Sequence, residues 1–136
     1  LLDMGVEPYL LTSSILAVIG QRLLRLLCTA CRRRGRANAA EAELLRGQGD
    51  QARLFRPVGC PECGDLGYKG RTGIFEIMVM TDDLRELVLQ RRPASALQAT
   101  AVASGMQTLQ ESARRKVLEG ITSVEEYRRL VLAEAG

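Results

Sequence analysis

Four cysteines in two matched pairs are the residues of this chain best suited to chemistry. The pairs are Cys28-Thr-Ala-Cys31 and Cys60-Pro-Glu-Cys63, separated by 28 residues, and no histidine is present to replace a sulfur ligand. Two cysteines three positions apart present both thiolates to one point from a tight turn. Two such turns complete the tetrahedron that Zn²⁺ favours. The spacing therefore predicts one metal ion held by four thiolates.

Other chemistry is open to the same cysteines. Disulfides, thiol redox exchange and an iron centre all use cysteine side chains. A thioredoxin-type motif needs one Cys-x-x-Cys rather than two, and disulfide scaffolds belong mainly to small secreted domains. Pro61 and Gly64 favour a metal, because a Cys-Pro-x-Cys-Gly turn leaves backbone amides free to point at sulfur. Four thiolates leave no position for water or substrate, so the pattern predicts one structural Zn²⁺.

A basic run follows the first cysteine pair. It consists of Arg32, Arg33, Arg34 and Arg36. Such a cluster can bind nucleic acid, but no aromatic residue alternates with these arginines to stack on bases. We therefore expect a solvated loop or a contact with an acidic protein surface, and no nucleic acid partner.

Catalytic motifs are absent from the sequence. It has no histidine, no Gly-x-Ser-x-Gly elbow and no Gly-x-x-x-x-Gly-Lys-Ser/Thr phosphate loop. The acidic pairs Asp82-Asp83 and Glu125-Glu126 fall at expected helix starts, where carboxylates stabilise the helix dipole. The sequence thus predicts no catalytic residue, and we expect the chain to be a fragment rather than a complete enzyme.

The composition predicts a mainly helical protein. Of the 136 residues, 46% are hydrophobic and only 4% aromatic, so aliphatic side chains must fill the interior. This length allows one modest core or two small ones. The net charge of +3 is too mild to indicate nucleic acid by itself. The longest apolar run, 9–20, is interrupted by Thr12, Ser13 and Ser14 and falls short of the roughly 20 residues that cross a bilayer.

Two extended segments must position the cysteine turns. Residues 71–80 are rich in β-branched and aromatic side chains and predict a strand, whereas residues 21–28 fit either a helix or a strand. We expect the two segments to pair as an antiparallel ribbon with the cysteine turns at one end. Upstream, a helix is expected to end at Gly5, and a second helix is expected at about 12–20.

Helices account for most of the remainder. A short helix at 39–46, capped by Asn38, is expected between the cysteine pairs. The last third should form four helices with one shared core, at about 82–91, 96–103, 109–119 and 124–134. Three capping boxes mark helix starts, namely Ser95 with Gln98, Thr108 with Glu111, and Ser123 with Glu126. The expected fold class is mostly α with a small antiparallel β ribbon.

Several strings along the chain match one known family. They are Leu2-Asp3-Met4-Gly5-Val6-Glu7-Pro8-Tyr9-Leu10-Leu11, Gln21-Arg22-Leu23, both cysteine pairs, Gly67-Tyr68-Lys69-Gly70-Arg71-Thr72-Gly73-Ile74-Phe75-Glu76, Gly105-Met106 with Leu109, and Lys116-Val117-Leu118-Glu119-Gly120-Ile121-Thr122-Ser123 with Glu125-Glu126. Together they resemble the traffic ATPases of type II secretion and type IV pilus assembly, the GspE/PilB group. The resemblance covers essentially the whole chain. Thr29 departs from the proline that the family commonly has there, which bears only on the rigidity of that turn.

The resemblance implies a parent protein with an activity that this chain alone lacks. The parent would be a cytoplasmic, hexameric, RecA-like ATPase, peripheral to the bacterial inner membrane, that powers pilus or pseudopilus assembly for protein export. Its phosphate loop and acidic boxes would lie upstream, so ATP and Mg²⁺ would bind only in the parent. Arg22 would be the position that approaches the nucleotide; otherwise it forms an ordinary strand salt bridge. Partners would be other copies of the chain and an inner-membrane platform or recruiting protein.

The same resemblance implies a division of the chain. Residues 1–27 would be the last helix and strand of the RecA-like α/β core, and 28–66 a zinc-binding insertion. Residues 67–80 would return to the core, and 81–136 would form a C-terminal helical subdomain. The cysteines favour a secretion or pilus-assembly member over a retraction ATPase, and they do not separate the first two.

A competing hypothesis comes from another functional class. The chain could be a stand-alone zinc ribbon that binds nucleic acid and is followed by a helical bundle. A metal-bearing scaffold with no activity is a third possibility. The ATPase hypothesis predicts that the zinc stiffens a protein-contact surface and takes no part in a chemical step.

Overall fold

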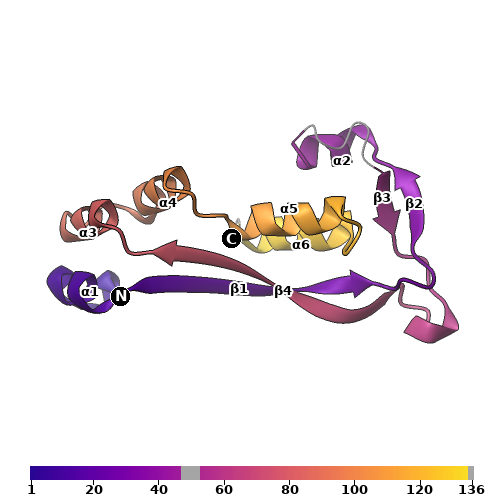
Figure 1. Cartoon of the computed structure of the whole chain (residues 1–136), viewed down its shortest axis with the longest axis horizontal. Coiled ribbons are helices and arrows are strands. Elements are labelled where there is room, and N and C mark those ends of the chain that lie inside the picture. Colours follow the sequence, from indigo (N-terminus) through magenta and orange to yellow (C-terminus); the bar gives the residue numbers. More distant parts are fainter. Residues whose placement is uncertain (47–52, 135–136) are drawn as a thin grey trace. The chain divides into compact units, whose positions relative to one another are not determined.

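A computed structural model describes residues 1–46 and 53–134 of the chain (Figure 1). In these two ranges the elements, in chain order, are a 3₁₀ turn η1 (Leu2–Met4), α1 (Pro8–Ser14), β1 (Ala17–Leu27), β2 (Arg33–Arg36), α2 (Ala39–Leu44), β3 (Arg53–Arg56), a 3₁₀ turn η2 (Pro61–Cys63), β4 (Tyr68–Val79), α3 (Asp82–Leu89), α4 (Ala94–Ala103), α5 (Leu109–Leu118) and α6 (Val124–Glu134). In the described ranges the helices hold more residues than the strands, which agrees in part with the mostly α fold class expected from composition.

The described strands form two separate two-stranded sheets. β1 pairs with β4, and their arrows run in opposite directions in Figure 1. This confirms the expected antiparallel ribbon and assigns residues 21–28 mainly to a strand. β2 pairs antiparallel with β3, with Arg34 opposite Phe55 and Gly35 opposite Leu54. The sequence did not predict this second pair, because its short, arginine-rich strands lack β-branched residues.

The chain divides into two compact units, each built from two separate segments. Unit 1 comprises Leu1–Gly20 and Phe75–Thr108, and unit 2 comprises Gln21–Ile74 and Leu109–Gly136. β1 and β4 each contribute residues to both units. Neither unit is therefore a continuous stretch of sequence.

Unit 1 packs α1, α3 and α4 around a small core of Met80, Leu84 and Ala101. The expected helix at 12–20 is wrong, since α1 ends at Ser14 and β1 begins at Ala17. Pro8 occupies the first turn of α1, where its missing N–H costs no hydrogen bond. Residues from Ala17 onward instead pair with β4, and strand pairing overrides the local helical pattern.

Unit 2 holds the larger core, in which α5 and α6 pack with side chains from the strands and from α2. Its most deeply buried members are Leu24, Leu45, Leu54, Ile74, Ala113, Val117 and Val124. The expected single core for the last four helices is therefore wrong. Residues of α3 and α4 belong to the core of unit 1, while those of α5 and α6 belong to this one. Val102 of α4 is 44% exposed.

Helix caps follow the sequence in part. Asn38 caps α2 in a complete capping box with Glu41, as predicted. α4 begins earlier than expected, with Pro93 at the N-cap, so Ser95 lies inside its first turn and caps nothing. Pro93 fits this position because its fixed φ suits a helix entrance.

The start of α6 uses its capping-box residues in an unexpected way. The Ser123 hydroxyl accepts a hydrogen bond from the Glu126 amide at 3.3 Å. The Glu126 carboxylate, however, accepts from the backbone N–H of Arg25 at 2.8 Å and from its guanidinium at 2.9 Å. It also accepts from Arg129 at 2.8 Å. The predicted acidic cap thus ties α6 to β1.

Glu126 is a buried carboxylate held in its charged form. Its side chain is 1% exposed, whereas the side chains of Arg25 and Arg129 are 49% and 62% exposed. Burial alone would raise the pKa of Glu126, but the hydrogen bonds from Arg25 and Arg129 hold it below 4.5. The ring of Tyr68 lies 4.0 Å from the Arg25 guanidinium carbon, and its hydroxyl bonds Ser123 at 2.7 Å.

We predict that Glu126→Gln lowers the free energy of unfolding by about 1–2 kcal/mol at pH 7, because the variant loses its charge-assisted hydrogen bonds to Arg25 and Arg129. The loss is smaller than for a fully buried ion pair, since both arginine side chains are about half exposed to water. A folded pKa below 4.5 means that ionised Glu126 stabilises the protein above pH 4.5 and loses this effect as pH falls. Urea unfolding between pH 3 and 7 should therefore show a flatter acid limb in the variant.

Glu125→Gln is the matched control, because Glu125 lies in the same turn but is exposed. It should leave both the stability at pH 7 and the acid limb close to wild type. Equal effects of the two variants would contradict a specific role for Glu126.

Candidate metal centre

The four cysteine side chains predicted to bind a metal converge on one point. Their sulfur atoms all lie within 4.8 Å of one another. Three of the separations are 3.9 Å for Cys28 to Cys60, 3.8 Å for Cys31 to Cys63, and 3.7 Å for Cys60 to Cys63. Sulfur atoms about 2.3 Å from a shared zinc ion in a tetrahedron are separated by about 3.8 Å, so this spacing suits one ion. Disulfide bonds need about 2.05 Å and are not formed.

Local structure presents the sulfur atoms from two turns. Cys28 directly follows the last residue of β1, and its N–H donates to the Gly67 carbonyl at 3.0 Å. The second pair spans the 3₁₀ turn η2, which Gly64 ends in a left-handed conformation. This confirms the predicted role of Pro61 and Gly64 in shaping a tight turn. The hydrogen bond from Cys28 to Gly67 joins the two turns.

Backbone amides surround the sulfur atoms. The N–H of Gly59 donates to Cys31 Sγ at 3.3 Å, while those of Cys60 and Gly67 donate to Cys63 Sγ at 3.2 Å each. Such donors compensate negative charge on thiolates. Amide donors were expected at the second cysteine pair, but those of Gly59 and Gly67 were not among the predicted residues. The signal available was a glycine on each side of the second cysteine pair.

The thiols of the second pair differ in acidity. Burial raises the pKa of Cys60 to about 11. Burial also acts to raise the pKa of Cys63, but amide hydrogen bonds from Cys60 and Gly67 outweigh it and lower that value to about 7. The turn thus favours a thiolate at Cys63 before any cation is bound. Four convergent sulfur donors with amide support fit a soft, tetrahedral metal ion.

Arg22, the residue expected to approach a nucleotide, lies on β1 in unit 2. Its side chain is 55% exposed, pairs with Glu134 at 3.4 Å and donates to the Gln21 carbonyl at 2.9 Å. In the described part of the chain, no hydrogen bond or ion pair links it to the cysteine turns. Arg22 thus forms an ordinary salt bridge, the alternative role expected for it.

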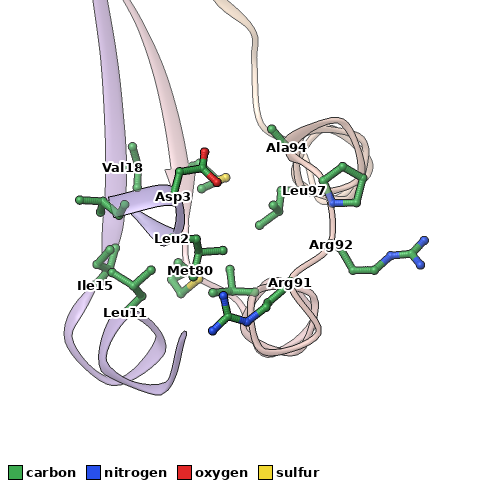
Figure 2. Close-up of a pocket in the computed structure, with 14 residues that line it drawn as sticks. Leu2, Asp3, Leu11, Ile15, Val18, Met80, Arg91, Arg92, Ala94 and Leu97 are labelled. Carbon is green, nitrogen blue, oxygen red and sulfur yellow. The ribbon is translucent and has the colours of Figure 1, made fainter. Parts of the chain in front are cut away.

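A pocket of about 620 Å³ lies within unit 1, bounded by α1, α3, α4 and the strand ends (Figure 2). Its walls are mainly apolar, and its charged lining residues are Asp3, Arg91 and Arg92. Arg91 pairs with Glu7 at 3.9 Å, and Arg92 points away from the pocket in Figure 2. No group of polar side chains converges on this space, so the cysteine turns are the stronger candidate site.

Comparison with known proteins places the chain among secretion proteins. A family model described as "Type II/IV secretion system protein" matches residues 1–129. A type II secretion system protein E from Pseudomonas aeruginosa is 46% identical, over 98% of this chain and 27% of its own length. A type IV pilus assembly ATPase from Myxococcus xanthus is 38% identical, over 93% and 23%. The type II secretion system ATPase E of Vibrio cholerae is 37% identical, over 94% and 25%.

The chain spans about a quarter of the length of these relatives. The family match runs through the cysteine turns and the helices alike, which does not favour a stand-alone nucleic-acid module. None of the helices in the described residues combines the length and apolar character needed to cross a lipid bilayer.

Gly67 provides a test of how the site is built. Its φ is +76°, and an added Cβ would lie 2.6 Å from Pro57 Cβ and 3.0 Å from the Val58 nitrogen. We predict that Gly67→Ala costs about 2–4 kcal/mol, combining left-handed strain with overpacking, and weakens metal binding. Urea unfolding and titration with Zn²⁺ measure the two effects.

Gly64→Ala is the matched control, because Gly64 is also left-handed at φ +58° but an added Cβ would meet nothing within 4 Å. It should cost only about 1–2 kcal/mol. A Gly67→Ala variant no less stable than Gly64→Ala would contradict the crowded packing around Gly67.

Proposed function

The chain belongs to the type II/IV secretion system protein family, and from this membership we propose that it is the C-terminal part of a hexameric ATPase that powers pilus or pseudopilus assembly for protein export. The observation that carries the proposal is the family match over residues 1–129, cysteine turns included. Two of the similar relatives are themselves named ATPases. ATP and Mg²⁺ would bind to the remainder of the parent protein, since this sequence has no phosphate loop.

The cysteine turns would hold one structural Zn²⁺ in this assembly. Cys28, Cys31, Cys60 and Cys63 supply four sulfur ligands, which close the coordination shell. Zinc, when bound, supplies folding energy here and takes no part in a chemical step. The residues 28–66 would then form a stapled module rather than a free loop.

Exposed apolar side chains support a place at the end of a larger core. In unit 1, Ile77 and Val79 of β4 are 49% and 59% exposed, and Val18 and Ile19 of β1 are 48% and 63% exposed. A two-stranded ribbon is marginal by itself, and exposed apolar clusters mark surfaces that are covered in the assembled protein. We infer that residues 1–27 and 67–80 complete a RecA-like α/β core of the parent.

The zinc module would present a contact surface for the rest of the machine. Each subunit of a hexameric motor must transmit nucleotide-driven motion to a partner, and a stapled module transmits displacement better than a flexible loop. The helical residues 81–136 would close the subunit. The partner would be an inner-membrane platform or recruiting protein. The parent would then lie in the bacterial cytoplasm at the inner face of that membrane.

We predict that replacing Cys60 and Cys63 by serine in the parent protein reduces bound zinc from one ion per subunit to less than about half, because two thiolates bind far more weakly than four. Export should be lost, while ATP hydrolysis by the purified protein stays within about threefold, since the closed site has no catalytic role. Metal analysis, an export assay and phosphate release measure these three properties.

The matched control is Thr29→Pro, which changes the first turn without removing a ligand. It should keep both the zinc and the export activity. Full zinc content in the double serine variant would contradict the metal proposal. Normal export by a zinc-free variant would contradict the contact role.

Arg22 is proposed, more narrowly, to approach the nucleotide of the parent. Arg22→Ala should then raise the KM for ATP by about fivefold or more, because a cation near phosphate contributes to binding. Glu134→Gln removes the salt bridge that Arg22 makes in this chain and keeps the guanidinium. If both variants leave the KM unchanged, Arg22 has only its structural role.

A further inference from the structure

The net positive charge of this chain is concentrated around the β2–β3 hairpin. Residues 28–63 contain seven basic and four acidic side chains, whereas the rest of the sequence contains twelve of each. All seven basic residues are arginines. Arginine presents a planar fork of donors that matches a carboxylate or phosphate in two hydrogen bonds, which lysine does not. The segment that contains the hairpin is therefore rich in side chains that suit planar anions such as carboxylates.

The register of the hairpin separates its two faces. Leu54, opposite Gly35, is 0% exposed and belongs to the core of unit 2. Arg34 and Arg36 project from the other face, at alternate positions of β2. Both are exposed, and neither forms an ion pair within the described residues. The hairpin thus carries an arginine face, defined by Arg34 and Arg36, opposite its buried face.

The same hairpin already binds a carboxylate within the chain. Arg56 donates from both terminal nitrogens to the two oxygens of Glu41, at 2.8 Å each. The Arg56 hydrogen bond is the main cause that holds the pKa of Glu41 below 4.5. This pair is an example, within the chain, of an arginine that binds a carboxylate through two hydrogen bonds. Because Glu41 is already paired with Arg56, it does not neutralise the charge of Arg34 or Arg36.

The ring of Phe55 partly orders the arginine face. Phe55 lies opposite Arg34 in the register, and the Arg34 guanidinium carbon lies 5.4 Å from the ring centre. Arg32 lies over the same ring at 4.5 Å and donates to the Gly120 carbonyl at 2.6 Å. Cation–π contacts of this kind restrict long side chains before a partner arrives, which lowers the entropic cost of binding.

We propose that the arginine face binds an extended acidic segment of a partner protein, with carboxylates at alternate positions that match Arg34 and Arg36. This inference rests on the proposed contact role of the zinc module and names the chemistry of the contact. Bases would need an open aromatic ring, but Phe55 is half-buried and stacked by arginines. A membrane surface would need exposed apolar side chains beside the charge, and among the described residues of 28–63 only Val58 is a large exposed one.

The test uses the full 136-residue chain loaded with Zn²⁺ and a fluorescein-labelled (Glu-Thr)₄ peptide, followed by fluorescence anisotropy. Arg34→Gln with Arg36→Gln should weaken binding by about fivefold or more, and rising salt should weaken binding to the wild type. Arg71→Gln with Arg92→Gln removes the same charge from exposed residues elsewhere and should change the affinity less than about twofold. A (Gln-Thr)₄ peptide should not bind.

Equal weakening by the two double variants would overturn the proposal, because the effect would then follow net charge alone. Tighter binding to a single-stranded oligonucleotide, or to vesicles with anionic lipids, would also overturn it. Arg34→Lys with Arg36→Lys tests the planar fork and should bind about two- to threefold more weakly than wild type. The zinc content and the circular dichroism spectrum of each variant must match those of the wild type. A variant that keeps its zinc but loses affinity for the peptide separates this contact from the metal proposal.

Discussion

The meeting of two cysteine turns is the constraint on which unit 2 depends. The turns follow β1 and precede β4, so the ribbon, the β2–β3 hairpin and α2 must be arranged to bring four sulfur atoms within 4.8 Å. Amide donors to the sulfur atoms and the hydrogen bond from Cys28 to Gly67 help to hold the two turns together. With both ends of the intervening segment fixed, a short hairpin can keep charged side chains on one face without a large core of its own.

Features encoded by local spacing could be predicted from the sequence. The cysteine pairs, the Asn38 cap and the strand now called β4 depend on residues a few positions apart, and each lies where expected. The ribbon followed from the two extended segments beside the cysteines. For the site, the ligands were predictable, whereas the amides of Gly59 and Gly67 depend on how the turns fold together.

Features set by distant contacts could not be predicted in this way. Residues 17–20 look apolar enough for a helix, but pairing with β4 makes them a strand. Glu126 reads as a reciprocal cap, yet its carboxylate binds Arg25, which lies about a hundred positions upstream. The last four helices read as one bundle, but their side chains enter two cores. In each case a tertiary contact overrides a local preference.

The interleaved arrangement of the two units bears on how this region can fold during synthesis. The first segment of unit 1 leaves the ribosome before its partner segment, Phe75–Thr108, has been made. Unit 2, begun in between, cannot close until α5 and α6 emerge. The segments made first therefore expose apolar surface until their partner segments have been made. This favours a late, concerted collapse and binding by chaperones. Truncation before α5 would leave the larger core without the helices that complete it.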